Sequence, residues 1–133
     1  MKLTKNFNSR EFDCNDGTSV PERYMDNCRE VAKNLQVLRD FIGEPVNITG
    51  SGYRTPSHNK KVGGAKHSQH LTCSAADIST KSYTPRQLAK IIIKLINSGK
   101  MKQGGIGLYN GFVHYDIRGA KARWGNFSWF NFW

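Results

Sequence analysis

The dipeptide Asn110-Gly111 constrains the fold of this chain more than any other feature, because it separates two apolar, extended segments at 106–109 and 112–117. Asn-Gly between such segments is the strongest short-range signal for a β-hairpin. Residues two apart in a strand face the same way. We therefore expect the side chains of His114 and Asp116, in the second segment, to project from one face of a sheet.

Two segments show the three- and four-residue apolar spacing of amphipathic helices. The first runs from Pro21 to a stop at Gly43, and the second begins at the capping box of residues 84–87. Short extended segments at 46–49 and 75–78 supply further strands. The pattern predicts an α+β fold, with a small, mainly antiparallel sheet and two principal helices packed against it.

The length of 133 residues suits one folded unit, so residues 1–133 are treated as a single domain. The aromatic-rich C-terminal extension 124–133 is expected to fold back onto that domain. No apolar stretch has the length of a membrane span, and the charged start lacks the apolar run of a secretory signal. We therefore expect synthesis in the cytoplasm without an export signal.

The three cysteines lack paired spacings, which predicts reduced thiols.

The chain is strongly basic, with 20 Lys and Arg against 10 Asp and Glu and a formal net charge of +10. Such a charge favours anionic partners: nucleic acid, anionic lipid or the bacterial cell wall. The basic residues are scattered along the chain, and only Lys60 and Lys61 are adjacent. No recognition helix with clustered Arg and Lys is visible, which argues against a specific nucleic-acid binder.

Two stretches, 68–77 and 114–116, concentrate the side chains that could bind a metal ion. A catalytic zinc site uses three imidazole, thiolate or carboxylate ligands and leaves a fourth position open for water. His70 and Asp77 would face opposite sides of a continuous strand, so they converge only if the chain turns at 72–74. The chain has no His-Glu-x-x-His motif, which excludes a helix-borne metalloprotease site.

Four segments, in order, closely resemble the peptidase M15 family: 51–59 (SGYRTPSHN), 68–77 (SQHLTCSAAD), 104–107 (GGIG) and 112–118 (FVHYDIR). This family contains zinc D-alanyl-D-alanine carboxypeptidases and related phage endolysins, which share a metal-site fold with the hedgehog signalling domain. The resemblance covers nearly the whole chain, and its ordered set of motifs is more specific than any single one. It implies an α+β fold around one Zn²⁺ and hydrolysis of peptidoglycan stem peptides or their cross-links.

Carried over residue by residue, the resemblance makes three side chains the metal ligands: His70, Asp77 and His114. Arg54 is similar to the family arginine near the metal, where a guanidinium suits a developing oxyanion or a substrate carboxylate. A structural salt bridge is the alternative role for Arg54. Ser68 and Gln69 are expected to support the loop that carries His70, with Ser68 also a candidate for substrate contact.

The general base is the open assignment. Some relatives place a glutamate three residues before the last histidine, where this chain has Gly111. We hypothesise that Asp116 takes a proton from zinc-bound water. Two alternatives stand beside it: Asp116 orients a ligand imidazole, or Asp116 binds the metal while His114 acts as acid and base. Cys73 replaces a usual glycine three residues after His70, a spacing from which a thiolate could also reach the metal.

These features together predict a zinc-dependent peptidase that hydrolyses bacterial peptidoglycan, of the carboxypeptidase or endopeptidase type, as in a bacteriolytic phage endolysin. We expect a monomer. The missing export signal fits endolysins, which often reach the wall through a membrane hole made by a second protein. The alternative function is a non-catalytic, zinc-stabilised module that binds cell wall or protein.

Overall fold

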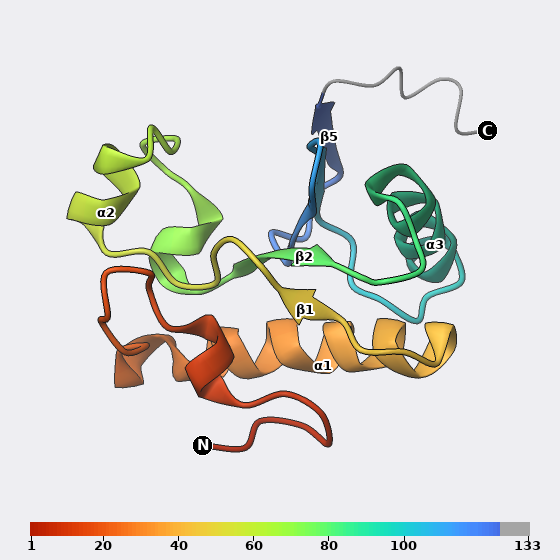
Figure 1. Cartoon of the computed structure of the whole chain (residues 1–133), viewed down its shortest axis with the longest axis horizontal. Coiled ribbons are helices and arrows are strands. Elements are labelled where there is room, and N and C mark those ends of the chain that lie inside the picture. Colours follow the sequence, from red (N-terminus) through yellow and green to blue (C-terminus); the bar gives the residue numbers. More distant parts are fainter. Residues whose placement is uncertain (126–133) are drawn as a thin grey trace.

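The computed structural model describes residues 1–125 and shows a five-stranded sheet between helices (Figure 1). Its elements in chain order, with η for a 3-10 helix, are η1 (Ser9–Phe12), η2 (Glu22–Tyr24), α1 (Met25–Ile42), β1 (Asn47–Ile48), α2 (Pro56–Lys61), η3 (Gln69–Thr72), β2 (Ala75–Ser79), α3 (Pro85–Asn97), β3 (Gly105–Leu108), β4 (Val113–Asp116) and β5 (Ala122–Gly125).

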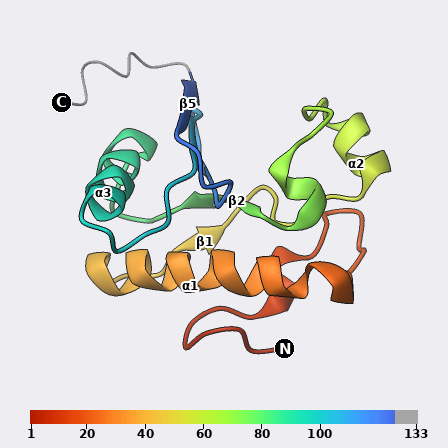
Figure 2. The same cartoon turned by 180° about the vertical axis from the view of Figure 1, so that it is seen from behind.

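The strands lie in the order β1-β2-β4-β3-β5, and every neighbouring pair is antiparallel except β3 and β5. The predicted α+β class with a mainly antiparallel sheet is therefore confirmed. Helix α1 runs along one side of the molecule, while α2 and α3 lie at opposite ends with the strands between them (Figures 1 and 2).

The predicted hairpin is present as β3 and β4, and the Tyr109 N–H donates to the Phe112 carbonyl at 3.1 Å across its turn. Neither Asn110 nor Gly111 adopts a positive φ angle, so the turn does not use the left-handed conformation that makes Asn-Gly common in hairpins. The signal located the turn correctly, although its usual conformational reason does not apply here.

The predicted helices are confirmed with one shifted boundary. α1 begins at Met25 rather than at Pro21, because residues 22–24 form the separate 3-10 turn η2. It ends at Ile42, and the capping residue Gly43 has a left-handed φ of 71°, which suits a residue without a Cβ. The capping box of α3 is complete: Thr84 Oγ1 accepts from the Gln87 N–H, and the Gln87 side chain accepts from the Thr84 N–H.

Two local structures around the later site depend on turns. The turn expected at 72–74 is present, with Cys73 in the left-handed region at φ 55° after η3. Helix α2 was not expected from the sequence, because its six residues are too few to show an apolar period. Thr55 caps it by accepting a hydrogen bond from the His58 N–H.

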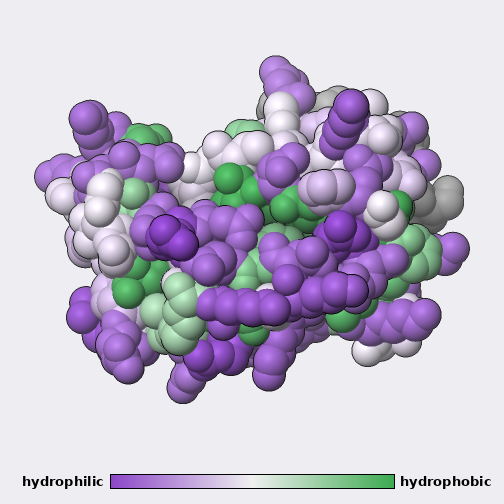
Figure 3. Space-filling view, turned by 60° about the horizontal axis from the view of Figure 1, so that its bottom comes forward, coloured by the Kyte–Doolittle hydropathy of each residue, from purple (hydrophilic) through white to green (hydrophobic). Residues whose placement is uncertain are grey.

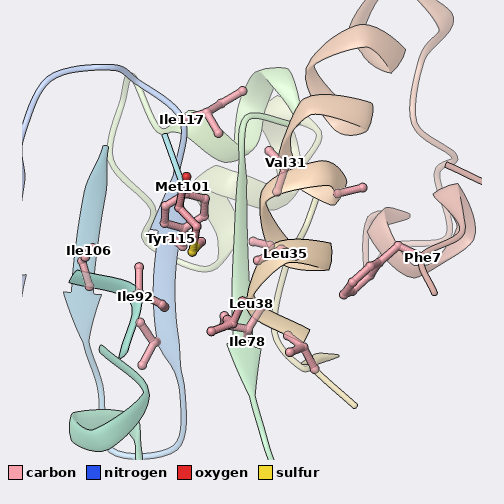
Figure 4. Packing of buried hydrophobic residues seen from close by; sticks show 14 of the residues in the cluster. Phe7, Val31, Leu35, Leu38, Ile78, Ile92, Met101, Ile106, Tyr115 and Ile117 are labelled. Carbon is pink, nitrogen blue, oxygen red and sulfur yellow. The ribbon is translucent and has the colours of Figure 1, made fainter. Parts of the chain in front are cut away.

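The core lies between α1, α3 and one face of the sheet (Figure 4). Its fully buried members include Leu35 and Leu38 from α1, Ile92 from α3, and Ile106 and Tyr115 from the hairpin. Burying one such side chain contributes roughly 1.5–3 kcal/mol to folding. The core-facing residues of β2, β3 and β4 alternate with a second set on the opposite face, and that second set forms the site described below.

All three cysteines are buried free thiols, as predicted.

The visible surface in Figure 3 is mostly hydrophilic with small, separate apolar areas. None of the helices within residues 1–125 is long and apolar enough to cross a membrane. Of the predicted aromatic extension 124–133, Trp124 and Gly125 belong to β5, and positions 126–133 lie outside the described residues.

Candidate metal centre

One row of side chains crosses the sheet on the face opposite the core. The strand register pairs Asp77 of β2 with His114 of β4, His114 with Gly107 of β3, and Gly107 with Trp124 of β5. Asp116 stands two residues after His114 and therefore on the same face. The prediction that His114 and Asp116 project together is confirmed by the 2.7 Å separation of His114 Nε2 and Asp116 Oδ2.

His70 reaches this row from η3, outside the sheet. Its Nδ1 lies 2.7 Å from the carbonyl oxygen of Gly52. Because a carbonyl oxygen only accepts hydrogen bonds, Nδ1 carries the proton and Nε2 presents a lone pair. That Nε2 lies 3.3 Å from Asp77 Oδ1. The turn at Cys73 therefore brings His70 and Asp77 together. The sequence predicted that these two residues could converge only through a turn at 72–74.

His114 presents its other ring nitrogen to the same point. Its Nε2 faces the carboxylate of Asp116, which accepts a proton, so the lone pair is on Nδ1. Nδ1 lies 3.3 Å from Asp77 Oδ1. Two imidazole lone pairs and one carboxylate oxygen therefore point at a single position.

The chemistry of these three groups fits a metal ion. Asp77 Oδ1 is buried and accepts no hydrogen bond from any residue in the described range 1–125. An orphaned carboxylate oxygen between two lone pairs is unfavourable unless a cation satisfies all three. Tetrahedral ligands at zinc-like bond lengths lie about 3.3–3.5 Å from one another. The 3.3 Å separations of His70 Nε2 and His114 Nδ1 from Asp77 Oδ1 match that spacing.

The electrostatics of the site favour a bound cation. Burial raises the pKa of Asp77, but the adjacent imidazoles of His114 and His70 outweigh this effect and lower the pKa to about 2. Asp77 is therefore a carboxylate at every ordinary pH. Burial opposes protonation of His114, yet the carboxylates of Asp116 and Asp77 prevail and raise its pKa. A proton on His114 supplies positive charge beside these carboxylates, and a bound metal ion would replace that proton.

Asp116 lies behind His114, away from the point where the ligands meet. It is fully buried and receives hydrogen bonds from the Gly105 N–H at 2.8 Å and from the Arg118 guanidinium at 2.8–3.1 Å. Burial raises its pKa, but hydrogen bonds from His114, Arg118 and the Gly105 backbone lower it well below the usual range. Among the three roles considered for Asp116, this geometry favours orientation of the His114 ring.

Arg54 approaches the opposite side of Asp77. Its Nη2 lies 3.6 Å from Asp77 Oδ2, the oxygen that does not face the imidazoles. Its Nε donates to Ser51 Oγ at 3.0 Å, and its Nη1 donates to Asn59 Oδ1 at 3.1 Å. These contacts fix a guanidinium whose side chain is 16% exposed at the edge of the site.

The three ligand candidates and Arg54 open into one pocket of about 410 Å³. A pocket of this size suits a small peptide or a similar ligand. Its other walls come from the loop after α2, from the hairpin turn and from β5: Val62, Gly63, Gly64, Ala65, Tyr109, Phe112 and Trp124. The rings of Tyr109 and Phe112 stack at 4.6 Å between centroids.

Three other residues considered in the sequence lie apart from this pocket as residues 1–125 define it: Ser68, Gln69 and Cys73. Ser68 Oγ accepts from the His70 N–H at 3.2 Å, and the Gln69 carbonyl accepts from the Ser74 N–H at 2.9 Å. Both therefore support the loop that carries His70. Cys73 is fully buried in the core, where contact with Cys28 and burial raise its pKa, so its thiol lies away from the ligand cluster.

Trp124 is a site residue that the sequence did not assign. Its indole lies 5.0 Å from the His114 ring between centroids, and its Nε1–H donates to the Tyr109 hydroxyl at 2.9 Å. The indole occupies space that Gly107 leaves free, because a Cβ there would lie 2.5 Å from Trp124 Nε1. Glycine within a strand pattern often marks such a close approach, and this was the available signal.

We expect Gly107→Ala to lower the free energy of unfolding by about 1–3 kcal/mol, because the new methyl group overlaps the Trp124 indole. In a Trp124→Ala background the same change should cost less than about 0.5 kcal/mol. Urea unfolding of the four proteins in this double-mutant cycle measures the difference. Gly111→Ala is the control, since a Cβ there meets no heavy atom within 4 Å. An equal cost in both backgrounds would contradict the contact.

Two imidazoles and a carboxylate that converge beside an open pocket are the donor set of a catalytic metal site, here carried by an α+β fold. The sequence matches the family described as Peptidase M15 over residues 3–116, so the chain belongs to the peptidase M15 family. This membership makes it a metallopeptidase. No match was found among curated proteins.

Proposed function

We propose that the protein is a zinc-dependent peptidase that hydrolyses peptidoglycan stem peptides or their cross-links, as an endolysin does. The observation that carries the proposal is the orphaned oxygen of Asp77, which lies between two imidazole lone pairs at the edge of a peptide-sized pocket. Zinc accepts this donor set and needs only three protein ligands when it is catalytic.

The proposed metal ligands are His70, Asp77 and His114. When bound there, zinc would polarise a substrate carbonyl and make water a stronger nucleophile. Within this chain, the Gly52 carbonyl and Asp116 keep the two imidazoles in the tautomers that face Asp77. Membership of the peptidase M15 family supports the reaction class.

Arg54 is the proposed substrate-orienting group. Its guanidinium lines the pocket beside Asp77, where it can donate to a substrate carboxylate or to the oxyanion that forms during hydrolysis. A formal net charge of +10 favours approach to an anionic cell wall. The charge adds attraction without selecting the bond that is cut.

The proposal predicts that the protein releases peptide fragments from purified peptidoglycan only when its metal is present. Mass spectrometry of the soluble products, before and after treatment with a chelator, measures this. Cleavage should disappear with the chelator and return when Zn²⁺ is added back, because the metal supplies the activation that the side chains lack.

The masses of the fragments distinguish the two peptidase types. Loss of one alanine indicates a carboxypeptidase, whereas release of stem or cross-link fragments indicates an endopeptidase. Chelator-insensitive cleavage would refute the proposal. A zinc-loaded protein that binds several wall types and releases nothing would support the alternative, a non-catalytic binding module.

A further inference from the structure

A second group of metal-ligating side chains converges outside the site described above. Cys14, Asp16 and His58 each present one ligand atom, and these atoms all lie within 4.8 Å of one another. Cys14 is buried, His58 is half-buried and Asp16 is exposed. The group therefore lies at the surface, with its sulfur on the inner side and its carboxylate in contact with solvent.

The group joins two segments that are distant in sequence. Cys14 and Asp16 lie in a tight loop, closed by hydrogen bonds from the Cys14 N–H to the Thr18 carbonyl and from the Gly17 N–H to the Cys14 carbonyl, both 2.9 Å. Gly17 has a φ of +94°, a backbone conformation that residues with a side chain rarely adopt. His58 lies in α2, so the loop and the helix each contribute to the group.

One hydroxyl group fixes the two segments relative to each other. Thr55 Oγ1 donates to Asp16 Oδ2 at 2.8 Å and accepts from the His58 N–H at 3.2 Å. The Thr18 N–H donates to Asp16 Oδ1 at 2.9 Å. Each carboxylate oxygen has two lone pairs and can accept more than one interaction, so Asp16 keeps a lone pair available while its position is fixed.

Within residues 1–125, the Cys14 sulfur makes a weak polar contact with Thr55 Oγ1 at 4.0 Å. A buried cysteine often acts simply as a small apolar side chain. Here, however, an imidazole and a carboxylate lie beside the sulfur, and thiolate, imidazole and carboxylate are the three ligand types of zinc sites.

We propose that Cys14, Asp16 and His58 form a second metal site for a zinc-like divalent ion, with water as the fourth ligand. Tetrahedral coordination places such ligand atoms about 3.3–3.8 Å apart, so separations that are all within 4.8 Å close with small side-chain movements. Thiolate and imidazole favour zinc-like transition metals, whereas calcium and magnesium require oxygen ligands.

The consequence of the site is structural. An ion at this position links the loop 14–18 to α2, and α2 leads directly into residues 62–65, which form one wall of the pocket. Metal bound here stabilises that wall without any contact with His70 or His114. The inference does not depend on the proposed peptidase activity.

Cobalt is the probe that separates the two sites. A thiolate bound to Co²⁺ gives an intense charge-transfer band in the near ultraviolet, and the ligands His70, Asp77 and His114 contain no sulfur. Titration of the full chain, freed of metal by a chelator, should reach two equivalents of Co²⁺ and show this band. Cys14→Ser and His58→Gln should each bind one equivalent and lose the band.

Two further variants complete the design. Asp77→Asn should keep the charge-transfer band and lose the other equivalent. His67→Gln removes an exposed histidine outside both groups and should behave as the wild type. One equivalent without a thiolate band in the wild type overturns the proposal. A band that survives in Cys14→Ser, or a second equivalent without a band, also overturns it.

Discussion

Arg54→Ala should lower the rate of peptide hydrolysis by about 10²- to 10³-fold while the protein keeps its fold and its metal. This magnitude is typical for the loss of one donor that stabilises a developing oxyanion. Arg54 lies at the pocket edge and is fixed by Ser51 and Asn59, so its guanidinium is oriented before a substrate arrives. Metal content, measured on the same preparation, should stay at the wild-type level.

The alternative role of Arg54 is a structural ion pair with Asp77, whose Oδ2 lies 3.6 Å from Nη2. If that role were the important one, Arg54→Ala would lower thermal stability or metal content in proportion to activity. Arg54→Lys refines the comparison, because lysine keeps the charge and loses the planar, two-donor geometry. Lysine should restore little of the rate if the guanidinium orients a carboxylate or an oxyanion.

A charge control is needed because the substrate proposed here is anionic. Arg10→Ala removes one positive charge at an exposed position outside the pocket lining of residues 1–125. Its effect on the rate of hydrolysis should be no larger than the effect of an ordinary change in the ionic strength of the buffer. Wild-type rates in Arg54→Ala, or equal losses in both variants, would contradict the role assigned to Arg54.

Local signals were sufficient for much of the fold. The capping box of α3 and the left-handed Gly43 after α1 depend on residues within one turn, so the sequence located both. The hairpin followed from the apolar segments on either side of Asn110-Gly111, and its alternation placed His114 and Asp116 on one face. Helix α2 and the exact start of α1 were missed because short 3-10 and α turns lack a detectable period.

The site was harder to predict because its geometry is non-local. The convergence of His70 with Asp77 requires the turn at Cys73, and the ring orientation of His70 requires the Gly52 carbonyl from another segment. Sequence spacing indicated where a turn could lie, but it could not give the tautomer of either imidazole. His58 shows the same limit, since its neighbours come from a loop more than forty residues earlier.

Asp116→Asn should weaken zinc binding by about 10- to 100-fold, with a parallel loss of hydrolysis at limiting zinc. The reason lies in the proton of His114. The asparagine oxygen can still accept from the Gly105 N–H, which places its NH₂ group against His114 Nε2. That nitrogen must then accept, so the proton moves to Nδ1 and blocks the lone pair that faces Asp77.

Hydrolysis at saturating zinc distinguishes the two main roles of Asp116. If Asp116 orients the ring, excess zinc displaces the Nδ1 proton and most of the rate returns. If Asp116 is the base that accepts a proton during hydrolysis, the rate stays low even when the metal content equals that of the wild type. The exposed Asp26→Asn provides the same change in charge away from the site and should leave both measurements unaltered. Because Asp116 is fully buried and already accepts from Arg118, Gly105 and His114, we expect the rate to return.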